Sequence, residues 1–256
     1  DGDLISNNNN CNDGDCQFTN ISTISTLWGS WQHPGWADLD NDGDLDHIVI
    51  DNQTDFIYLQ NNDSTFTKKF YNQAVPNDIN LGNPNIISSS SIADIDNDGD
   101  LDILILRNGS EQNTLLLHNG DENNDGLYDV TFEKVGLDLS INESFAKAIT
   151  SSWGDYDNDG DLDLFIGNDH FSNFLYNNNG DGTFEKILEG VVVNDGGLEE
   201  EHCISQSSSW GDYDNDGYLD LFVANSCNLS VLEPYADVSN FLYHNNGDGT
   251  FEKIID

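Results

Sequence analysis

The chain has 256 residues, and its 48 Asp and Glu against 7 Lys and Arg give a formal net charge of −41. So acidic a chain is a poor candidate for nucleic-acid binding, because phosphate contacts require Lys and Arg. The 13 Phe, 9 Tyr and 5 Trp argue against a disordered chain, and no apolar run approaches the roughly 20 residues of a membrane helix.

The chain begins with "DGDLI", which matches the second half of an acidic motif that recurs later. Residues 1–25 therefore read as a shortened repeat unit without its first strand. This start leaves three alternatives open: a small closed ring, an excerpt of a larger protein, or a missing strand supplied by another chain. Cys11 and Cys16 bracket a turn-like segment in the same region, and we expect them to form a disulfide.

The segment "WGSWQHPGW" follows, with Trp28, Trp31 and Trp36 around His33. An aromatic cluster of this kind is typical of a core between repeat units, and it is also compatible with a platform on which sugars stack. We expect the core role.

Four acidic motifs then occur in register with short apolar segments. They read "WADLDNDGDLDHIVI" from Trp36, "IADIDNDGDLDILIL" from Ile92, "WGDYDNDGDLDLFIG" from Trp153 and "WGDYDNDGYLDLFVA" from Trp210. Each is followed by a second apolar segment and then by a Thr-Phe segment after an Asn/Gly/Asp turn. Asn-Gly and Asp-Gly pairs mark hairpins, so each unit is predicted to contain four short strands.

Repeated four-stranded units with a period above fifty residues predict an all-β fold, a β-propeller with an acidic loop between the first and second strands of each blade. The chain is one propeller over residues 1–256, with four full units after the shortened one. Their bounds are 26–82, 83–140, 141–198 and 199–256. The structural alternative is a β-solenoid. Helical patterning is almost absent, and residues 189–202 hold one turn at most.

The spacing of the acidic loop is that of a metal site. In the third loop, numbered from Asp155, carboxylates stand at positions 1, 3, 5, 7 and 9 and a glycine at position 6. Alternate side chains of a tight turn converge, and position 7 offers a backbone carbonyl. A flexible shell of six to eight hard oxygens suits Ca²⁺ better than Mg²⁺. The predicted ligands are Asp38, Asp40, Asp42, Asp44, Asp46, Asp94, Asp96, Asp98, Asp100, Asp102, Asp155, Asp157, Asp159, Asp161, Asp163, Asp212, Asp214, Asp216, Tyr218 and Asp220.

A fifth loop of the same spacing interrupts the second unit, where "DENNDGLYD" supplies Asp121, Asn123, Asp125, Leu127 and Asp129. It is a candidate calcium site, and the alternative is a solvated acidic turn. An EF-hand is excluded for the four main loops. It requires Glu at position 12 and flanking helices, whereas Val49, Ile105, Ile166 and Val223 stand there.

The remaining cysteines and histidines favour a secreted, non-enzymatic protein. Cys203 and Cys227 flank the fourth loop symmetrically, so a hairpin brings them together. Two disulfides indicate an oxidising compartment, and the alternative is four free buried cysteines. His118 and His244 are assigned to the same place in the repeat as Asn177 and Gln60, which indicates a hairpin surface. Paired carboxylates alone do not indicate a glycosidase in so acidic a chain.

The motif D-x-D-x-D-G-x-x-D, preceded by Trp-Gly and followed by "DLFIGN" and "NFLYNNNGDGTFEKI", resembles the FG-GAP/VCBS repeat family, from about residue 25 to 256. The resemblance implies a β-propeller with one Ca²⁺ per loop, held by the side chains at positions 1, 3, 5 and 9 and the carbonyl at position 7. The family includes the integrin α-subunit propeller and many bacterial secreted proteins. Its propellers usually have seven blades, whereas this chain carries four full units.

We therefore expect an extracellular or cell-surface, calcium-stabilised propeller that acts in adhesion or surface assembly and is not an enzyme. Its partner is a protein or glycan at a cell surface, and self-association is compatible with the shortened first unit. One alternative is the scaffold of a polysaccharide-binding or polysaccharide-degrading protein, and a second is the protomer of a filament. Calcium has a structural role here, since the sequence contains no bistable helix pair of the kind that switches.

Overall fold

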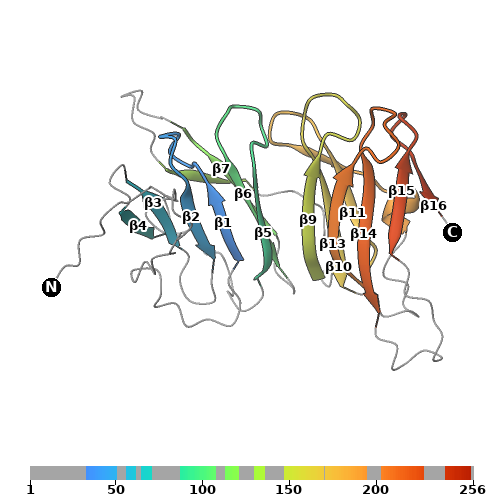
Figure 1. Cartoon of the computed structure of the whole chain (residues 1–256), viewed down its shortest axis with the longest axis horizontal. Helices are drawn as coiled ribbons and strands as arrows, with labels where there is room; N and C mark the ends of the chain where they lie inside the picture. The colour runs from blue at the N-terminus through green and yellow to red at the C-terminus, as the bar shows by residue number, and fades with distance from the viewer. Residues whose placement is uncertain are drawn as a thin grey trace, which may run out of the picture. The chain divides into compact units, whose positions relative to one another are not determined.

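The computed structural model describes residues 33–50, 56–61, 65–70, 87–107, 113–120, 130–135, 147–169, 171–194, 203–227 and 240–254. Within these residues the fold is all-β apart from one helical turn (Figure 1). No helix among them has the length and apolar character needed to cross a membrane. The predictions for Cys11, Cys16, Trp28, Trp31 and the fifth loop at 121–129 lie outside the described residues.

Each full repeat unit forms an antiparallel meander of four strands, as the sequence predicts. The first unit contains β1 (His33–Ala37), β2 (Asp46–Ile50), β3 (Phe56–Gln60) and β4 (Phe66–Phe70). The second contains β5 (Ile87–Ala93), β6 (Asp102–Arg107), β7 (Thr114–His118) and β8 (Phe132–Val135). The third contains β9 (Lys147–Gly154), β10 (Asp163–Asp169), β11 (Phe174–Asn178) and β12 (Phe184–Lys186). The fourth contains β13 (Cys203–Gly211), β14 (Asp220–Cys227), β15 (Phe241–Asn245) and β16 (Phe251–Ile254).

The helical turn is α2 (Val191–Asn194), inside the segment where the sequence predicts one turn at most. It buries Val192 and Val193 against the third and fourth units. A turn this short is stabilised by packing rather than by its own hydrogen bonds. Its role is therefore to fill the core between two sheets.

The core lies between consecutive units rather than within any one of them. Three clusters of buried side chains each combine residues of two neighbouring units. The second strands supply much of this apolar surface, and every residue of β6 and β10 is buried. This confirms that these strands are covered on both faces, and their continuous apolar runs follow from it. In β14 the same pattern fails on one face, since the Phe222 side chain is 42% exposed.

The first strands of successive units lie beside one another and are joined by serine side chains. Ser151 Oγ donates to Ser91 Oγ over 3.0 Å, and the Ser152 and Ser208 hydroxyls are 2.9 Å apart. Small side chains permit this approach. A Cβ added to Gly167 would lie 2.7 Å from Thr150 and 2.8 Å from Ser205. The serine-rich first strands thus allow the units to pack closely at this edge.

Candidate calcium loops

The four acidic loops connect the first strand of each unit to the second, at residues 38–46, 94–102, 155–163 and 212–220. Their backbone follows the same path in all four. Positions 4 and 6 both have positive φ, where L side chains are disfavoured and Asn and Gly are tolerated. The values at position 4 are 51° for Asn41, 58° for Asn97, 60° for Asn158 and 62° for Asn215. The glycines at position 6 have φ of 92° to 102°, which confirms the predicted turn of the backbone there.

The carboxylate at position 1 holds the tip of the loop. In the third loop, Asp155 accepts hydrogen bonds from the backbone N–H groups of Asp159 and Gly160 over 3.0 and 3.1 Å. Asp38 and Asp212 make the equivalent pair of bonds in the first and fourth loops. Position 5 then accepts from the N–H of position 7, over 2.9 Å in each loop. The loop is therefore shaped by its own carboxylates before any ion is considered.

The carboxylate at position 9 accepts two backbone hydrogen bonds, one on each oxygen, which the sequence reasoning did not anticipate. In the third loop, Asp163 accepts from the N–H of Tyr156 over 3.0 Å and from the N–H of Asn178 over 2.9 Å. It thereby joins the acidic loop to the end of the third strand. Asp46, Asp102 and Asp220 make the same two bonds in their own units. All four carboxylates are buried.

Carboxylate oxygens converge in every main loop. Each group in the list that follows places one ligand atom per residue within 4.8 Å of the others. The groups are Asp38, Asp40 and Asp42; Asp94, Asp96 and Asp102; Asp155, Asp157 and Asp163; and Asp212, Asp214 and Asp216. Positions 1 and 3 belong to all four groups, and position 5 or position 9 completes each.

Burial of these carboxylates opposes their ionisation. Desolvation raises the pKa of Asp40 to about 6, with neighbouring Asp46 and Asp42 adding to the effect. It also raises the pKa of Asp102 and of Asp163 to about 7, although each accepts two backbone hydrogen bonds that act in the opposite direction. Desolvation therefore outweighs the hydrogen bonds. Below about pH 7, both groups favour the protonated form unless a cation lies beside them.

Several of these oxygens have no partner that would explain their burial. Oδ1 of Asp40, of Asp94 and of Asp96 is buried and has no hydrogen-bond partner among the described residues. Buried charges are normally paired or coordinate a metal. A set of hard carboxylate oxygens with unfilled lone pairs fits Ca²⁺. The individual ligand assignments stay predictions.

Neighbouring loops are connected through positions 4 and 7. Asn41 Nδ2 donates to Asp100 Oδ1 over 2.8 Å, and Asn97 Nδ2 donates to Asp161 Oδ1 over 2.5 Å. The fourth loop has Tyr218 at position 7, and there Asn158 donates to the backbone carbonyl of Gly217 over 3.0 Å instead. The side chain at position 7 thus has an inter-unit role that is independent of its backbone carbonyl.

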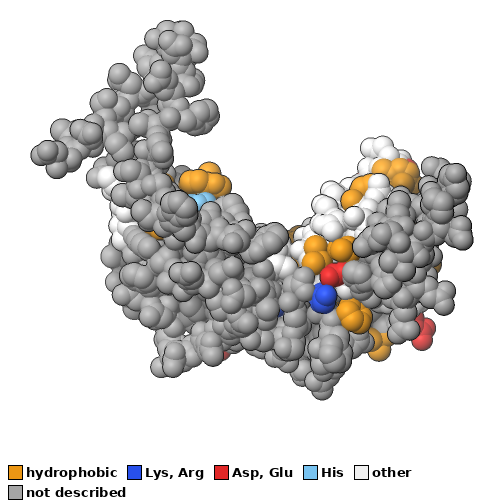
Figure 2. Space-filling model, turned by 90° about the horizontal axis from the view of Figure 1, so that it is seen from below, with side chains coloured by type: hydrophobic (Ala, Val, Ile, Leu, Met, Phe, Trp, Pro, Cys, Tyr) orange, Lys and Arg blue, Asp and Glu red, His pale blue; other side chains and the backbone are white. Residues whose placement is uncertain are grey.

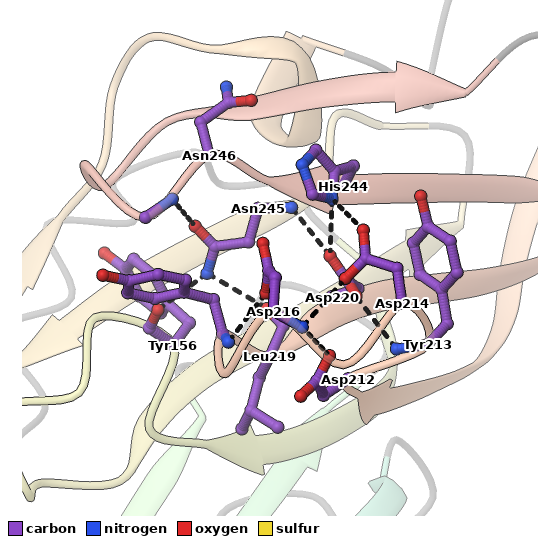
Figure 3. A network of polar contacts seen from close by, with 12 residues as sticks. Tyr156, Asp212, Tyr213, Asp214, Asp216, Leu219, Asp220, His244, Asn245 and Asn246 are labelled. Atoms are coloured by element: carbon purple, nitrogen blue, oxygen red, sulfur yellow. Dashed lines mark hydrogen bonds and ion pairs between the residues drawn. The ribbon is translucent and has the colours of Figure 1, made fainter.

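A second polar contact between units uses a buried asparagine at the end of the third strand. Asn178 Nδ2 donates to the carbonyl of Ile95 in the preceding unit over 2.7 Å and to the carbonyl of Leu162 over 3.0 Å. Asn245 repeats this with Tyr156 and Leu219, as Figure 3 shows. The sequence signal was available, because both asparagines stand at the same point before "NGDGTFEK".

These contacts correct the predicted alignment of the histidines. His118 donates its backbone N–H to Asp102 just as Asn178 and Asn245 do to their own aspartates, so His118 corresponds to them. His244 corresponds to Asn177 instead, and the prediction that the two histidines share one place was wrong by one residue. His118 is also buried, 3% exposed, and does not lie on a hairpin surface. Gaps of different length between strands concealed the shift.

His244 adds an imidazole to the fourth loop. Its Nδ1 lies 3.3 Å from Asp214 Oδ2 and 3.3 Å from Asp220 Oδ1, and the three side chains converge in Figure 3. In the third unit, Asn177 Nδ2 donates to Asp157 Oδ2 over 2.6 Å from the equivalent place. Asn177 and His244, which are equivalent in the repeat, therefore each contact the carboxylate at position 3 of their own loop.

Two further predictions have mixed outcomes. Cys203 and Cys227 are directly opposite each other in the β13–β14 pairing, which confirms that the hairpin brings them together. The disulfide itself stays a prediction.

Trp36 was expected in a core, but its side chain is 55% exposed and stacks on His47, with ring centroids 4.3 Å apart. The core assignment is therefore wrong for Trp36.

The chain matches the model of one protein family. Residues 38–105 and 155–223, which are more than half of the chain, match the model of the FG-GAP-like repeat. A comparison with curated protein sequences gave no match.

The chain is also similar to solved structures. A lectin from Agrocybe aegerita that recognises non-reducing terminal N-acetylglucosamine matches with a TM-score of 0.56 and 20% identity, over 88% of this chain and 52% of the lectin. The chain therefore spans about half the length of that lectin, and the likeness shows the fold alone. The structure of BBS1N in complex with ARL6DN matches with a TM-score of 0.44 and 10% identity, over 78% of this chain and 54% of that one.

Proposed function

Because the chain belongs to the FG-GAP-like repeat family, we propose that it is an extracellular, calcium-stabilised propeller module that acts in adhesion or surface assembly and catalyses no reaction. The observation that carries this proposal is the convergence of three carboxylates in each of four equivalent loops. FG-GAP repeats are typical of extracellular and surface proteins, where calcium near the millimolar range fills weak sites.

In each loop, positions 1, 3, 5 and 9 and the carbonyl of position 7 would hold the ion. The ion supplies positive charge, which offsets the mutual repulsion and the desolvation of the carboxylates. The protein supplies the remaining order, since position 1 fixes the tip of the loop and position 9 fixes its base. This division of roles supports structural calcium over a calcium switch.

The non-enzymatic part of the proposal is tested with a panel of polysaccharides. The calcium-loaded chain is incubated with each polymer, and the release of new reducing ends is measured. We expect no release above that of a heat-denatured control. Turnover that is lost on His244→Asn or His118→Asn, with the circular dichroism spectrum unchanged, would replace this proposal with that of a degradative enzyme.

A second candidate function is glycan binding, and the exposed Trp36 favours it. An indole that is 55% exposed and stacked on His47 offers an apolar face of the kind on which sugar rings pack. A glycan array compares the native chain with Trp36→Ala. Binding of a defined glycan that disappears in the variant supports this candidate, and an array without signal removes it.

A further inference from the structure

The described carboxylates are concentrated in the four acidic loops rather than spread over the molecule. Figure 2 shows a face on which few acidic side chains of the described residues are visible. One group of converging ligand atoms, in the fourth unit, includes a nitrogen, and it consists of Asp214, Asp220 and His244. The other four groups among the described residues consist of aspartates alone. The fourth unit therefore differs from the others in the kind of ligand that it offers to a cation.

The repeat shows that this imidazole is particular to the fourth unit. In each unit, one residue directly precedes the one whose backbone N–H binds position 9. It is Leu59, Leu117, Asn177 and His244 in turn. Leucine offers no ligand atom to a cation. Asn177 Nδ2 donates to Asp157 Oδ2 over 2.6 Å, so it occupies a carboxylate oxygen instead of adding a ligand. Of these four residues, His244 alone adds a ring nitrogen.

The two carboxylates that face His244 are oriented by the backbone. The Asp220 side chain is 1% exposed, and its Oδ1 accepts from the N–H of Asn245 over 2.8 Å. A carboxylate oxygen has two lone pairs, so this Oδ1 keeps one for a cation. Asp214 accepts from the N–H of Asp216 through Oδ1, which leaves its Oδ2 to face the imidazole. Metal-binding carboxylates are held by hydrogen bonds in this way.

The spacing of the three ligand atoms fits a small metal ion. His244 Nδ1 lies 3.3 Å from Asp214 Oδ2 and 3.3 Å from Asp220 Oδ1 (Figure 3). A hydrogen bond from a protonated imidazole to a carboxylate is shorter, about 2.7–2.9 Å, and this buried Nδ1 has no hydrogen-bond partner among the described residues. Two ligands of a tetrahedral zinc ion, with bonds of about 2.0–2.1 Å, lie about 3.3–3.4 Å apart. The two equal distances therefore fit a shared metal better than a direct ion pair.

The donor set and its exposure indicate which metal this is. An imidazole nitrogen is a good ligand for zinc, whereas calcium prefers oxygen ligands throughout. The His244 and Asp214 side chains are 24% and 35% exposed, so an ion can enter from solvent. Three protein ligands leave the fourth position of a tetrahedral zinc ion to water.

We propose that Asp214, Asp220 and His244 bind a zinc ion. Asp214 and Asp220 are also predicted calcium ligands, so zinc and calcium compete for the fourth loop. Without zinc, the loop still offers calcium the converging carboxylates of Asp212, Asp214 and Asp216. The inference goes beyond the proposed function, because it concerns a second metal and depends on the geometry of one loop.

The test measures zinc uptake by calorimetry on the calcium-loaded chain. We expect the native chain to bind one zinc ion more than His244→Asn, because asparagine at this place supplies no ring nitrogen. His47→Asn is the matched control. His47 also lies next to an acidic loop, but its Nδ1 contacts the Gly35 carbonyl over 3.1 Å and belongs to no group of converging ligands. This variant should keep the zinc uptake of the native chain, and unchanged circular dichroism verifies that both variants fold.

A gain of binding tests the same idea in the third unit. Asn177→His places an imidazole beside Asp157 and Asp163, which correspond to Asp214 and Asp220, so this variant should bind one zinc ion more than the native chain. Cobalt(II) is a second probe, because its visible absorption is strong only in a four-coordinate site. The native chain should show this absorption, and His244→Asn should lose it.

Unchanged zinc uptake in His244→Asn would overturn the proposal, as would an equal loss in His47→Asn. An Asn177→His variant that folds and gains no zinc would also contradict it, because the imidazole is the feature that distinguishes the two units. A chain that binds calcium but no zinc would remove this inference and leave the proposed function intact. A chain that binds zinc but no calcium would do the reverse.

Discussion

The third and fourth acidic loops have nearly the same sequence and the same backbone, yet their surroundings differ. In both, position 1 binds the N–H groups of positions 5 and 6, and position 9 binds two backbone N–H groups. The third loop is covered by the fourth unit, and Tyr156 at position 2 is 3% exposed. The fourth loop has no following unit among the described residues, and Tyr213 is 49% exposed.

This difference distinguishes the backbone turn and hydrogen bonds that a loop forms within itself from the burial that the next unit provides. The turn, its positive φ angles and its internal hydrogen bonds are local, since they are alike in covered and uncovered loops. Burial comes from the next unit. Desolvation follows from burial, so removal of charge or of a hydrogen bond should be felt more strongly in the third loop than in the fourth.

The largest expected effect is removal of the position 9 carboxylate. Asp163→Ala leaves the buried N–H groups of Tyr156 and Asn178 without acceptors, and each such loss costs about 1–3 kcal/mol. Asp220→Ala should cost less, because the bond from the N–H of Tyr213 is only partly buried, whereas the bond from the N–H of Tyr156 is buried. Urea denaturation in saturating calcium measures both free energies of unfolding. Equal losses in the two variants would show that the neighbouring unit has no bearing on this contact.

The stability of the calcium-free chain is expected to depend on pH, because the position 9 carboxylates are buried. Burial raises the pKa of Asp102 and Asp163 to about 7, so the folded state binds more protons than the unfolded state. Stability should therefore fall as pH rises from about 4, the ordinary value of an Asp carboxyl, through about 7. Each group contributes on the order of a few kcal/mol at most.

The measurement is a series of urea denaturations between pH 5 and pH 7.5 with a chelator. The double variant Asp102→Asn and Asp163→Asn should weaken the dependence, because it removes two of the carboxyls whose pKa is raised. Saturating calcium should also oppose the fall, since the ion binds the ionised form. Stability of the calcium-free native chain that rises across this window would contradict the assigned pKa shifts.

A smaller effect is expected from the asparagine at position 4. Asn97→Gly keeps a residue that tolerates positive φ but removes the bond to Asp161, a loss of about 1–2 kcal/mol. Asn215→Gly is the matched control in the uncovered fourth loop, where we expect a change within about 0.5 kcal/mol. Thermal unfolding of both variants in calcium measures the difference. An equal shift in both would show that the link between neighbouring loops is not stabilising.

Much of this arrangement could be predicted from the sequence because it is local and repeated. The four strands per unit, the buried second strands and the turn at Gly160 follow from short-range patterns that occur four times. The opposition of Cys203 and Cys227 follows from symmetry about a loop. Position 9 was predicted to be a metal ligand, but its two backbone bonds depend on where the third strand ends.

What the sequence did not reveal depends on neighbouring units. The exposure of Trp36 could not be inferred, because Trp153 and Trp210 have the same local sequence and pack on a preceding unit. His118 was placed one residue out of register, since the gaps between the second and third strands differ in length from unit to unit and gave no fixed reference. The role of Asp100 and Asp161 as acceptors from the preceding loop lies between units. The sequence of a motif predicts its own turn, but it does not predict which surface of a neighbouring unit the motif contacts.

Calcium occupancy is the central claim, and one combined measurement tests it directly. The metal-free chain is titrated with calcium in a calorimeter, and its melting temperature is recorded before and after. We predict at least one calcium for each of the four equivalent loops and a steep rise in melting temperature, because a ligand that binds the folded state stabilises it. A chain that binds no calcium and melts at the same temperature with and without EDTA would contradict the account.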